Sequence, residues 1–208
     1  GEQRYLDIAR SIATFVYTDL KDTPTGADAA AASYSPMDAT KVVNASAYRA
    51  WVLFEADARF NLLEYKAKAQ RNLNFILQSQ RADGAWLYAT EGSGEGFIDN
   101  FHTAFVLKNL YKINQRLKNP AIDAAIKKGW EFYRRELFNA AGDPKSFAIE
   151  PRKLIGKLEM DYFAEAITLG ALLQEFMSEA VVVAEHLSAK LCGRYHLPDG
   201  HVVTGVFK

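Results

Sequence analysis

Apolar residues recur every three or four positions in four segments of the chain, and polar residues occupy the opposite side of each segment. This spacing predicts amphipathic helices, because an α-helix brings residues i, i+3, i+4 and i+7 to one face. In the first segment the stripe consists of Leu6, Ala9, Ala13, Val16 and Leu20. The four predicted amphipathic helices cover residues 4–20, 64–81, 120–138 and 178–194.

Three further segments, residues 45–54, 103–111 and 163–173, are apolar on nearly all sides. A helix without a wide polar face is usually buried on both sides. No segment shows the pattern of a strand, so the expected fold class is all-α with little or no sheet.

The two kinds of helix alternate along the chain, which indicates a repeat. Similar turns follow the amphipathic helices, and Asp83, Asp143 and Asp199 in these turns are about 60 residues apart. A repeat of one buried and one amphipathic helix is a helical hairpin, and such hairpins stack into toroids or solenoids. We therefore predict a single domain, residues 1–208, of antiparallel helical hairpins that form a partial α/α toroid. The buried helices would make its inner layer.

The predicted toroid is incomplete. The pattern begins on an outer-type helix and stops where another inner helix is due, and three and a half hairpins are too few to close a ring. We expect either missing segments that complete the ring or an open arc that pairs with a second copy. The open edge would then carry an apolar patch, because such patches mark interfaces.

Composition narrows the classes of partner. Lys plus Arg and Asp plus Glu number 25 each, and this zero net charge gives no reason to expect a nucleic-acid partner. Cys192 is the only cysteine, so the chain cannot form an internal disulfide. No apolar stretch approaches the roughly 20 residues of a membrane span. These features favour a cytoplasmic location, with the periplasm as the alternative.

One turn resembles a motif of known toroids. Residues 78–86 read QSQRADGAW, in which Gln80, Gly84 and Trp86 match the Q-x-x-x-G-x-W turn of terpenoid-cyclase and prenyltransferase-like α/α toroids. The resemblance implies a structural role for the three residues, because in those families the motif ties an outer helix to the next turn.

A larger set of stretches resembles toroid proteins found beside bacterial exopolysaccharide genes, and the resemblance covers about residues 33–170. It implies a polysaccharide or oligosaccharide ligand. The stretches, in order, are SYSP (33–36), VVNAS (42–46), QRADGAWLY (80–88), FIDNFHTAFVL (97–107) and GDPKSF (142–147).

The sequence departs from both groups. Acid-initiated terpenoid cyclases carry several aspartates where this chain has only Asp99, which argues against that chemistry. Members of the exopolysaccharide-associated group tend to have a histidine near the third inner-helix start. This chain has Asp161, Tyr162 and Glu165 there instead, so no role of that histidine carries over.

Polar residues recur at the starts of the predicted inner helices. In a ring these starts meet at one end of the cavity, and their free backbone amides point there. We expect Asp99, His102, Asp161 and Glu165 to be the catalytic candidates. The expected substrate contacts are amides and aromatic rings, which suit a sugar: Asn44, Tyr48, Trp86, Tyr88, Asn100 and Tyr162. The alternative is that Asp99 only caps its helix and that the aromatic residues pack in the core.

Three functions fit this pattern. A glycoside hydrolase would use Asp99 and Asp161 as its two carboxyl groups, with Glu165 in reserve. A lyase would use His102 with Tyr88 or Tyr162 to move a proton, and Asn100 to bind a uronate. A non-catalytic polysaccharide-binding or assembly protein would use the same cavity, and a terpenoid or prenyl enzyme is the weakest alternative.

No cofactor and no metal ion is expected. The chain lacks a P-loop and a dinucleotide-binding glycine pattern. The spacing of His186, His196 and His201 does not suit zinc.

Overall fold

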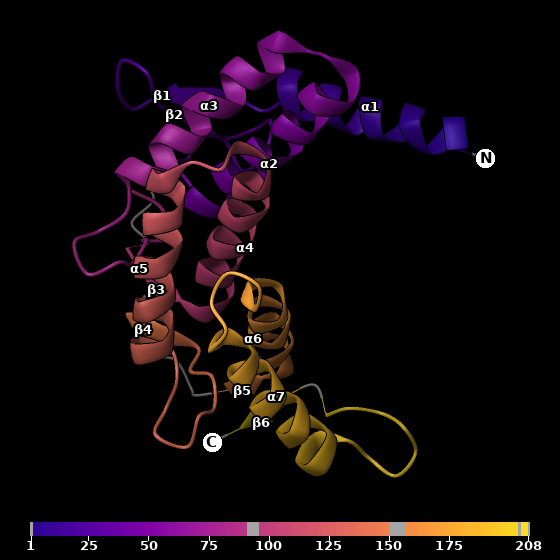
Figure 1. Ribbon diagram of the computed structural model, residues 1–208, viewed down its shortest axis with the longest axis vertical. Coiled ribbons are helices and arrows are strands. Elements are labelled where there is room, and N and C mark those ends of the chain that lie inside the picture. The colour runs from indigo at the N-terminus through magenta and orange to yellow at the C-terminus, as the bar shows by residue number, and fades with distance from the viewer. Residues whose placement is uncertain (1, 91–95, 150–156, 204, 208) are drawn as a thin grey trace.

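The computed structural model describes residues 2–90, 96–149, 157–203 and 205–207, and seven α-helices lie within these ranges (Figure 1). A π-helical turn, η1 (Leu191–Tyr195), extends the last of them. The prediction of an all-α partial toroid is confirmed. The helices are α1 (Glu2–Thr18), α2 (Val43–Phe60), α3 (Leu63–Gln78), α4 (Asn100–Leu117), α5 (Pro120–Glu136), α6 (Met160–Leu173) and α7 (Ala180–Lys190).

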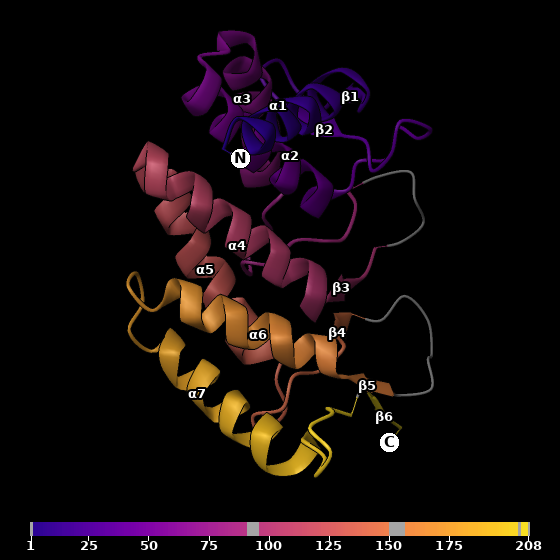
Figure 2. The same cartoon turned by 90° about the vertical axis from the view of Figure 1, so that its right-hand side faces the viewer.

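The helices form two layers. Helices α2, α4 and α6 lie side by side as the inner layer, and their starts lie on the same side of the molecule (Figure 2). Helices α3, α5 and α7 pack behind them, each against the inner helix that precedes it. The three segments that are apolar nearly all round are thus the inner helices, which have neighbours on three sides.

The inner helices are longer than their apolar cores suggest, and their ends have local causes. Asn61 and Lys118, the C-caps of α2 and α4, adopt left-handed backbone conformations with φ of 54° and 50°. A left-handed residue stops a helix and turns the chain. Helix α5 then starts directly, with Asn119 as its N-cap and Pro120 in its first turn.

The turn after α3 confirms the structural role predicted for Gln80, Gly84 and Trp86. The Gln80 side chain donates hydrogen bonds to the carbonyls of Gly84 (3.0 Å) and Ala125 (2.9 Å). Gly84 has φ +98°, and a Cβ atom there would lie 2.3 Å from the carbonyl oxygen of Lys128. Positive-φ glycines recur at 142 and 200, each 58 residues after the previous one, so the repeat is real.

Short strands are present where none was predicted. Within the described ranges, three antiparallel two-stranded ladders tie loops together: β1 (Asp22–Pro24) with β2 (Ala30–Ala32), β3 (Ile98–Asp99) with β4 (Phe147–Ile149), and β5 (Lys157–Glu159) with β6 (Gly205–Phe207). Strands of two or three residues are too short to show an alternating pattern, which explains why they were not predicted.

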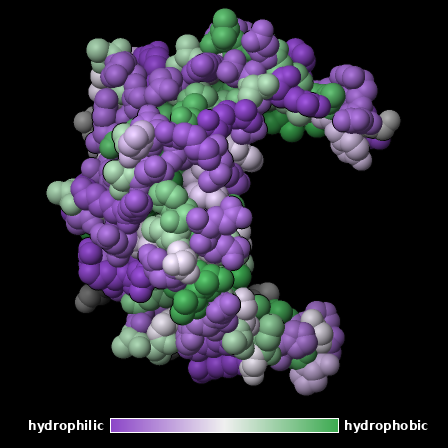
Figure 3. Space-filling model, in the orientation of Figure 1, coloured by the Kyte–Doolittle hydropathy of each residue, from purple (hydrophilic) through white to green (hydrophobic). Residues whose placement is uncertain are grey.

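The molecule is C-shaped, and α1 forms one arm of the C (Figures 1 and 3). Only Ala13 of α1 is buried. A second apolar stripe, absent from the sequence-based prediction, faces solvent, with side chains 46–73% exposed. It consists of Tyr5, Ile8, Ile12 and Phe15, whose spacing of three and four residues puts them on one face.

The sequence predicted an apolar patch on the open edge of the partial toroid, and this exposed stripe on α1 is the candidate for that patch. We expect the chain to self-associate through α1, because exposed apolar area costs about 25 cal/mol per Å². Light scattering should give a mass that rises with concentration, and combining Ile8→Gln with Ile12→Gln should return it to the monomer. Val182→Gln on α7, 61% exposed, is the control. A wild-type chain that stays monomeric at high concentration would contradict the prediction.

Candidate functional site

A pocket of about 270 Å³ lies between the end of α1, the first half of α2 and the start of α4, and we call it the α2–α4 pocket. Three of the predicted site residues, Asn44, Tyr48 and His102, line it. The complete lining is Val16, Leu20, Ser33, Tyr34, Asn44, Ala45, Tyr48, Arg49, Val52, Phe101, His102 and Phe105. The pocket is thus mostly apolar and aromatic with a few polar groups, as ligand pockets usually are.

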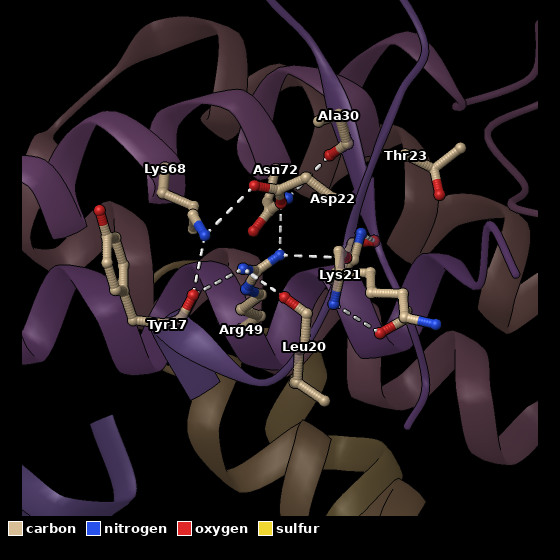
Figure 4. Close-up of polar contacts among 12 residues, drawn as sticks. Tyr17, Leu20, Lys21, Asp22, Thr23, Ala30, Arg49, Lys68 and Asn72 are labelled. Atoms are coloured by element: carbon tan, nitrogen blue, oxygen red, sulfur yellow. Dashed lines mark hydrogen bonds and ion pairs between the residues drawn. The ribbon is translucent and has the colours of Figure 1, made fainter. Parts of the chain in front are cut away.

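Arg49 fixes the wall of the pocket that α1 contributes. Arg49 is 1% exposed, and its guanidinium forms an ion pair with Asp22 and donates hydrogen bonds to the carbonyls of Tyr17 and Leu20 (Figure 4). It also donates to the carbonyls of Val16 and Lys21. These carbonyls belong to the last turn of α1 and the residues after it, where a cation is favourable. Arg49 therefore holds the end of α1 against α2.

His102 is the titratable group best placed for chemistry. Its Nδ1 lies 2.6 Å from Oδ2 of Asp99, and its backbone N–H donates to Oδ1 of the same carboxylate (3.0 Å). Asp99 is thus the N-cap of α4, as one reading of the sequence predicted, and it also orients the imidazole. With Nδ1–H directed at the carboxylate, Nε2 is the ring nitrogen left to exchange a proton with a ligand.

Aromatic rings fix the position of His102. Tyr88 meets it edge-on at 4.6 Å between ring centroids, and Tyr88 in turn stacks on Phe97 at 4.7 Å. Phe101 and Phe105, both in the pocket lining, meet it at 5.7 and 6.2 Å. Packing on several sides limits the ring to one orientation, which is what a proton-transfer group requires.

Asn44 and Tyr48 add polar groups from α2. Asn44 is 5% exposed, and within the described part of the chain its side-chain oxygen accepts no hydrogen bond. An unsatisfied buried acceptor is costly, so it suits a ligand that donates a hydrogen bond. Burial raises the pKa of the Tyr48 phenol, and the charge of Glu165 raises it further. The phenol therefore stays protonated at neutral pH and can donate a hydrogen bond.

Two predicted substrate contacts, Asn100 and Trp86, have side chains that are buried and hydrogen-bonded within the core. Asn100 is 0% exposed, donates to the carbonyl of Leu137 (3.1 Å) and accepts from the Tyr133 hydroxyl (2.6 Å). Trp86 is 2% exposed and donates its indole N–H to the carbonyl of Ile76 (2.9 Å). Neither group is available to a ligand in the α2–α4 pocket.

The other predicted residues lie outside the pocket lining. Tyr88, Asp99 and Trp86 line a void of about 10 Å³, which adjoins the α2–α4 pocket because Asn44 and His102 line both. On α6, Asp161 is exposed, while Tyr162 and Glu165 are half-buried. The predicted convergence of all these side chains on one pocket is therefore not met, although the helix starts lie on one side (Figure 2).

A row of basic residues on α4 was missed by the sequence analysis. Lys108, Lys112 and Arg116 recur every fourth position. Because α2, α5 and α6 cover the other sides of α4, this row faces the concave side of the molecule. Lys108 forms an ion pair with Glu165 of α6, and Arg116 forms one with Glu55 of α2 at 2.9 Å. The spacing was visible in the sequence, but nothing there showed which side of α4 remains open.

The described residues contain neither a group of metal-binding side chains nor a membrane-spanning helix. In those ranges, no three His, Cys, Asp or Glu side chains group as a metal site would require. Nor is any helix there long and apolar enough to cross a bilayer.

Comparison with known proteins places the fold. No family model matches the sequence, and no curated protein matches it. Solved structures do match. A D-mannose isomerase is 13% identical over 98% of this chain and 55% of its own, with a TM-score of 0.75. A sugar epimerase from a ruminal bacterium is 12% identical over 97% and 58%, with a TM-score of 0.76. The GH76 α-mannanase of Bacteroides thetaiotaomicron is 11% identical over 95% and 57%, with a TM-score of 0.71.

These likenesses show the fold alone, because sequence identity is low. They confirm the toroid part of the resemblance, and the finer likeness to exopolysaccharide-associated proteins stays a prediction. The chain spans little more than half the length of each of the three proteins.

Proposed function

We propose that the chain binds a carbohydrate in the α2–α4 pocket and that His102 acts there as the base in a proton transfer. The observation that carries the proposal is His102 in the pocket wall, with its Nδ1 held 2.6 Å from the Asp99 carboxylate behind it. Structures with this fold include an isomerase, an epimerase and a glycosidase that act on sugars, which supports a sugar ligand.

In the proposed reaction, His102 removes a proton from the sugar and Tyr48 stabilises the oxyanion that forms. Nε2 of His102 takes a proton from a sugar carbon next to a carbonyl or carboxyl group, and the electron pair of that C–H bond moves into an enolate. The Asp99 carboxylate stabilises the imidazolium that forms. The protonated Tyr48 phenol and the electron-rich Asn44 oxygen border the same pocket, and the phenol donates a hydrogen bond to the developing oxyanion. Return of the proton completes an isomerisation or epimerisation, and loss of a β-substituent completes an elimination.

Hydrolysis by the pair Asp99 and Asp161 has weaker support. Hydrolysis needs two carboxyl groups that flank the bond. Asp99 is 6% exposed and is engaged with the backbone and the ring of His102, whereas Asp161 is exposed on α6 outside the pocket. A terpenoid substrate also has weak support, because Asp99 stands alone at the start of α4, where acid-initiated cyclases carry several aspartates.

The test is hydrogen exchange into the sugar. Neutral and uronate sugars are incubated with the protein in D2O, and deuterium at carbon and unsaturated products are measured by NMR. We expect His102→Gln to lower the exchange rate by about 10²–10⁴-fold while binding persists. Asp99→Asn should also lower it, because the amide cannot stabilise the imidazolium. His186→Gln on α7 is the control.

Each alternative predicts a different outcome. If the wild-type protein binds sugars but catalyses neither hydrogen exchange nor product formation, the non-catalytic polysaccharide-binding function is favoured. Turnover that survives His102→Gln, or release of reducing ends without exchange, would contradict the assigned role of His102.

A further inference from the structure

We propose that the concave face beside the α2–α4 pocket binds an anionic group of the carbohydrate through Lys112, so that the ligand is an acidic oligosaccharide. This inference rests on the proposed function for the identity of the ligand as a sugar. The proposed subsite lies on α4 and α2, and it contains none of the residues assigned to the proton transfer.

Lys112 differs from the other two cations of its row. Lys108 is paired with Glu165, and Arg116 with Glu55. In the described part of the chain, the Lys112 ammonium has no carboxylate within 4.0 Å, and it lies 4.1 Å from the centroid of the Trp51 ring. A half-buried ammonium over an indole, without a counter-ion, is a place where an anion gains most.

The local field also favours an anion. Burial lowers the pKa of Lys112 below its ordinary value, and the positive charge of Lys108 lowers it further, against the opposite effect of Glu165. The first cause is loss of solvation, and the second is repulsion between two ammonium groups. A bound carboxylate or sulfate would offset both through its negative charge, whereas a neutral sugar would add no charge beside the ammonium.

The distance to the pocket sets the size of the ligand. Phe105 lines the pocket, and Lys112 lies seven residues further along the same helix, or about 10 Å at the rise of an α-helix. His102 is ten residues, or about 15 Å, from Lys112 along the axis. One monosaccharide cannot reach both, but an oligosaccharide can. Both residues lie on α4, one of the inner helices, which run side by side (Figure 2).

Calorimetry with matched ligands tests the proposal. The probes are tetragalacturonate, a sulfated oligosaccharide and neutral cellotetraose, each titrated into the full chain at low salt. We expect at least one of the anionic ligands to bind tenfold or more tightly than the neutral one. Lys112→Gln should remove that preference, and Lys112→Arg should keep most of it. Comparing the carboxylated with the sulfated ligand identifies the anionic group.

Lys127→Gln is the matched control, because Lys127 also lies over an aromatic ring, that of Phe176 at 5.5 Å, but on the outer helix α5. It should leave the preference unchanged, and circular dichroism should show that each variant is folded. The proposal is overturned if no anionic ligand binds, if Lys112→Gln keeps the preference, or if both lysine variants lose it equally. His102→Gln should keep the preference, so failure of the proton-transfer role and failure of this subsite are distinguishable.

Discussion

Replacement of Arg49 by methionine is expected to lower the free energy of unfolding by about 3–5 kcal/mol, the usual cost of breaking a buried ion pair from one side. The guanidinium is fully buried, pairs with Asp22 and serves four backbone carbonyls at the end of α1 (Figure 4). Methionine fills a similar volume but donates no hydrogen bond, so the carbonyls lose their partner. Urea unfolding followed by circular dichroism measures the loss.

Arg59→Met is the control for this substitution, because Arg59 lies on the same helix but is exposed. It should change stability by less than about 0.5 kcal/mol. Part of the charge of Asp22 remains compensated in Arg49→Met, since Lys68 Nζ lies 3.3 Å from its other oxygen. A loss below about 1 kcal/mol would mean that the Arg49 contacts contribute little, and the α1 wall of the pocket would then need another explanation.

Truncation of Trp86 to alanine should be comparably severe, at about 3–5 kcal/mol. The ring is buried, its N–H binds the carbonyl of Ile76, and a Cβ atom placed on Gly129 would lie 2.5 Å from it. Trp86 thus joins α3, the following turn and α5, and alanine leaves a cavity among all three. The midpoint of chemical unfolding at unchanged slope is the measurement.

Trp51→Ala provides the comparison for Trp86. Trp51 is half-buried on α2, with Lys112 over its ring, so its truncation should cost clearly less stability. If Trp86→Ala were the milder change, the Q-x-x-x-G-x-W turn would not be the structural tie that its contacts indicate.

The helices and the turns between them could be predicted from the sequence because their causes are local. A stripe such as Ile122, Ile126 and Tyr133 needs only helical spacing to be recognised, and all of it is buried in α5. The turn at Gly84 and the N-cap at Asp99 also depend on neighbours within a few residues. The ladders of the described residues could not be predicted, because strands of two or three residues show no alternating pattern, and β3 and β4 moreover pair across the whole of α4 and α5.

The site is a different case. The sequence pointed to the start of α4, where Asp99, Asn100 and His102 are close together, but it predicted that all three face one cavity. Only the packing of α4 separates them, because Asn100 turns towards α5 and is sealed by Tyr133, whereas His102 turns towards α2 and borders the pocket. Sequence spacing does not tell which face of a helix that is apolar nearly all round meets which neighbour.

The sequence by itself thus determined the helical hairpins, their order, and the turn chemistry that repeats every 58 residues, since these depend on contacts within a few residues. The tertiary structure alone decided the contacts between residues far apart in the chain. Arg49 reaches the end of α1, Lys108 meets Glu165, and Lys112 lies over Trp51. Each joins two helices that the sequence places about 30 to 60 residues apart, and only the side-by-side packing of α1, α2, α4 and α6 brings them together.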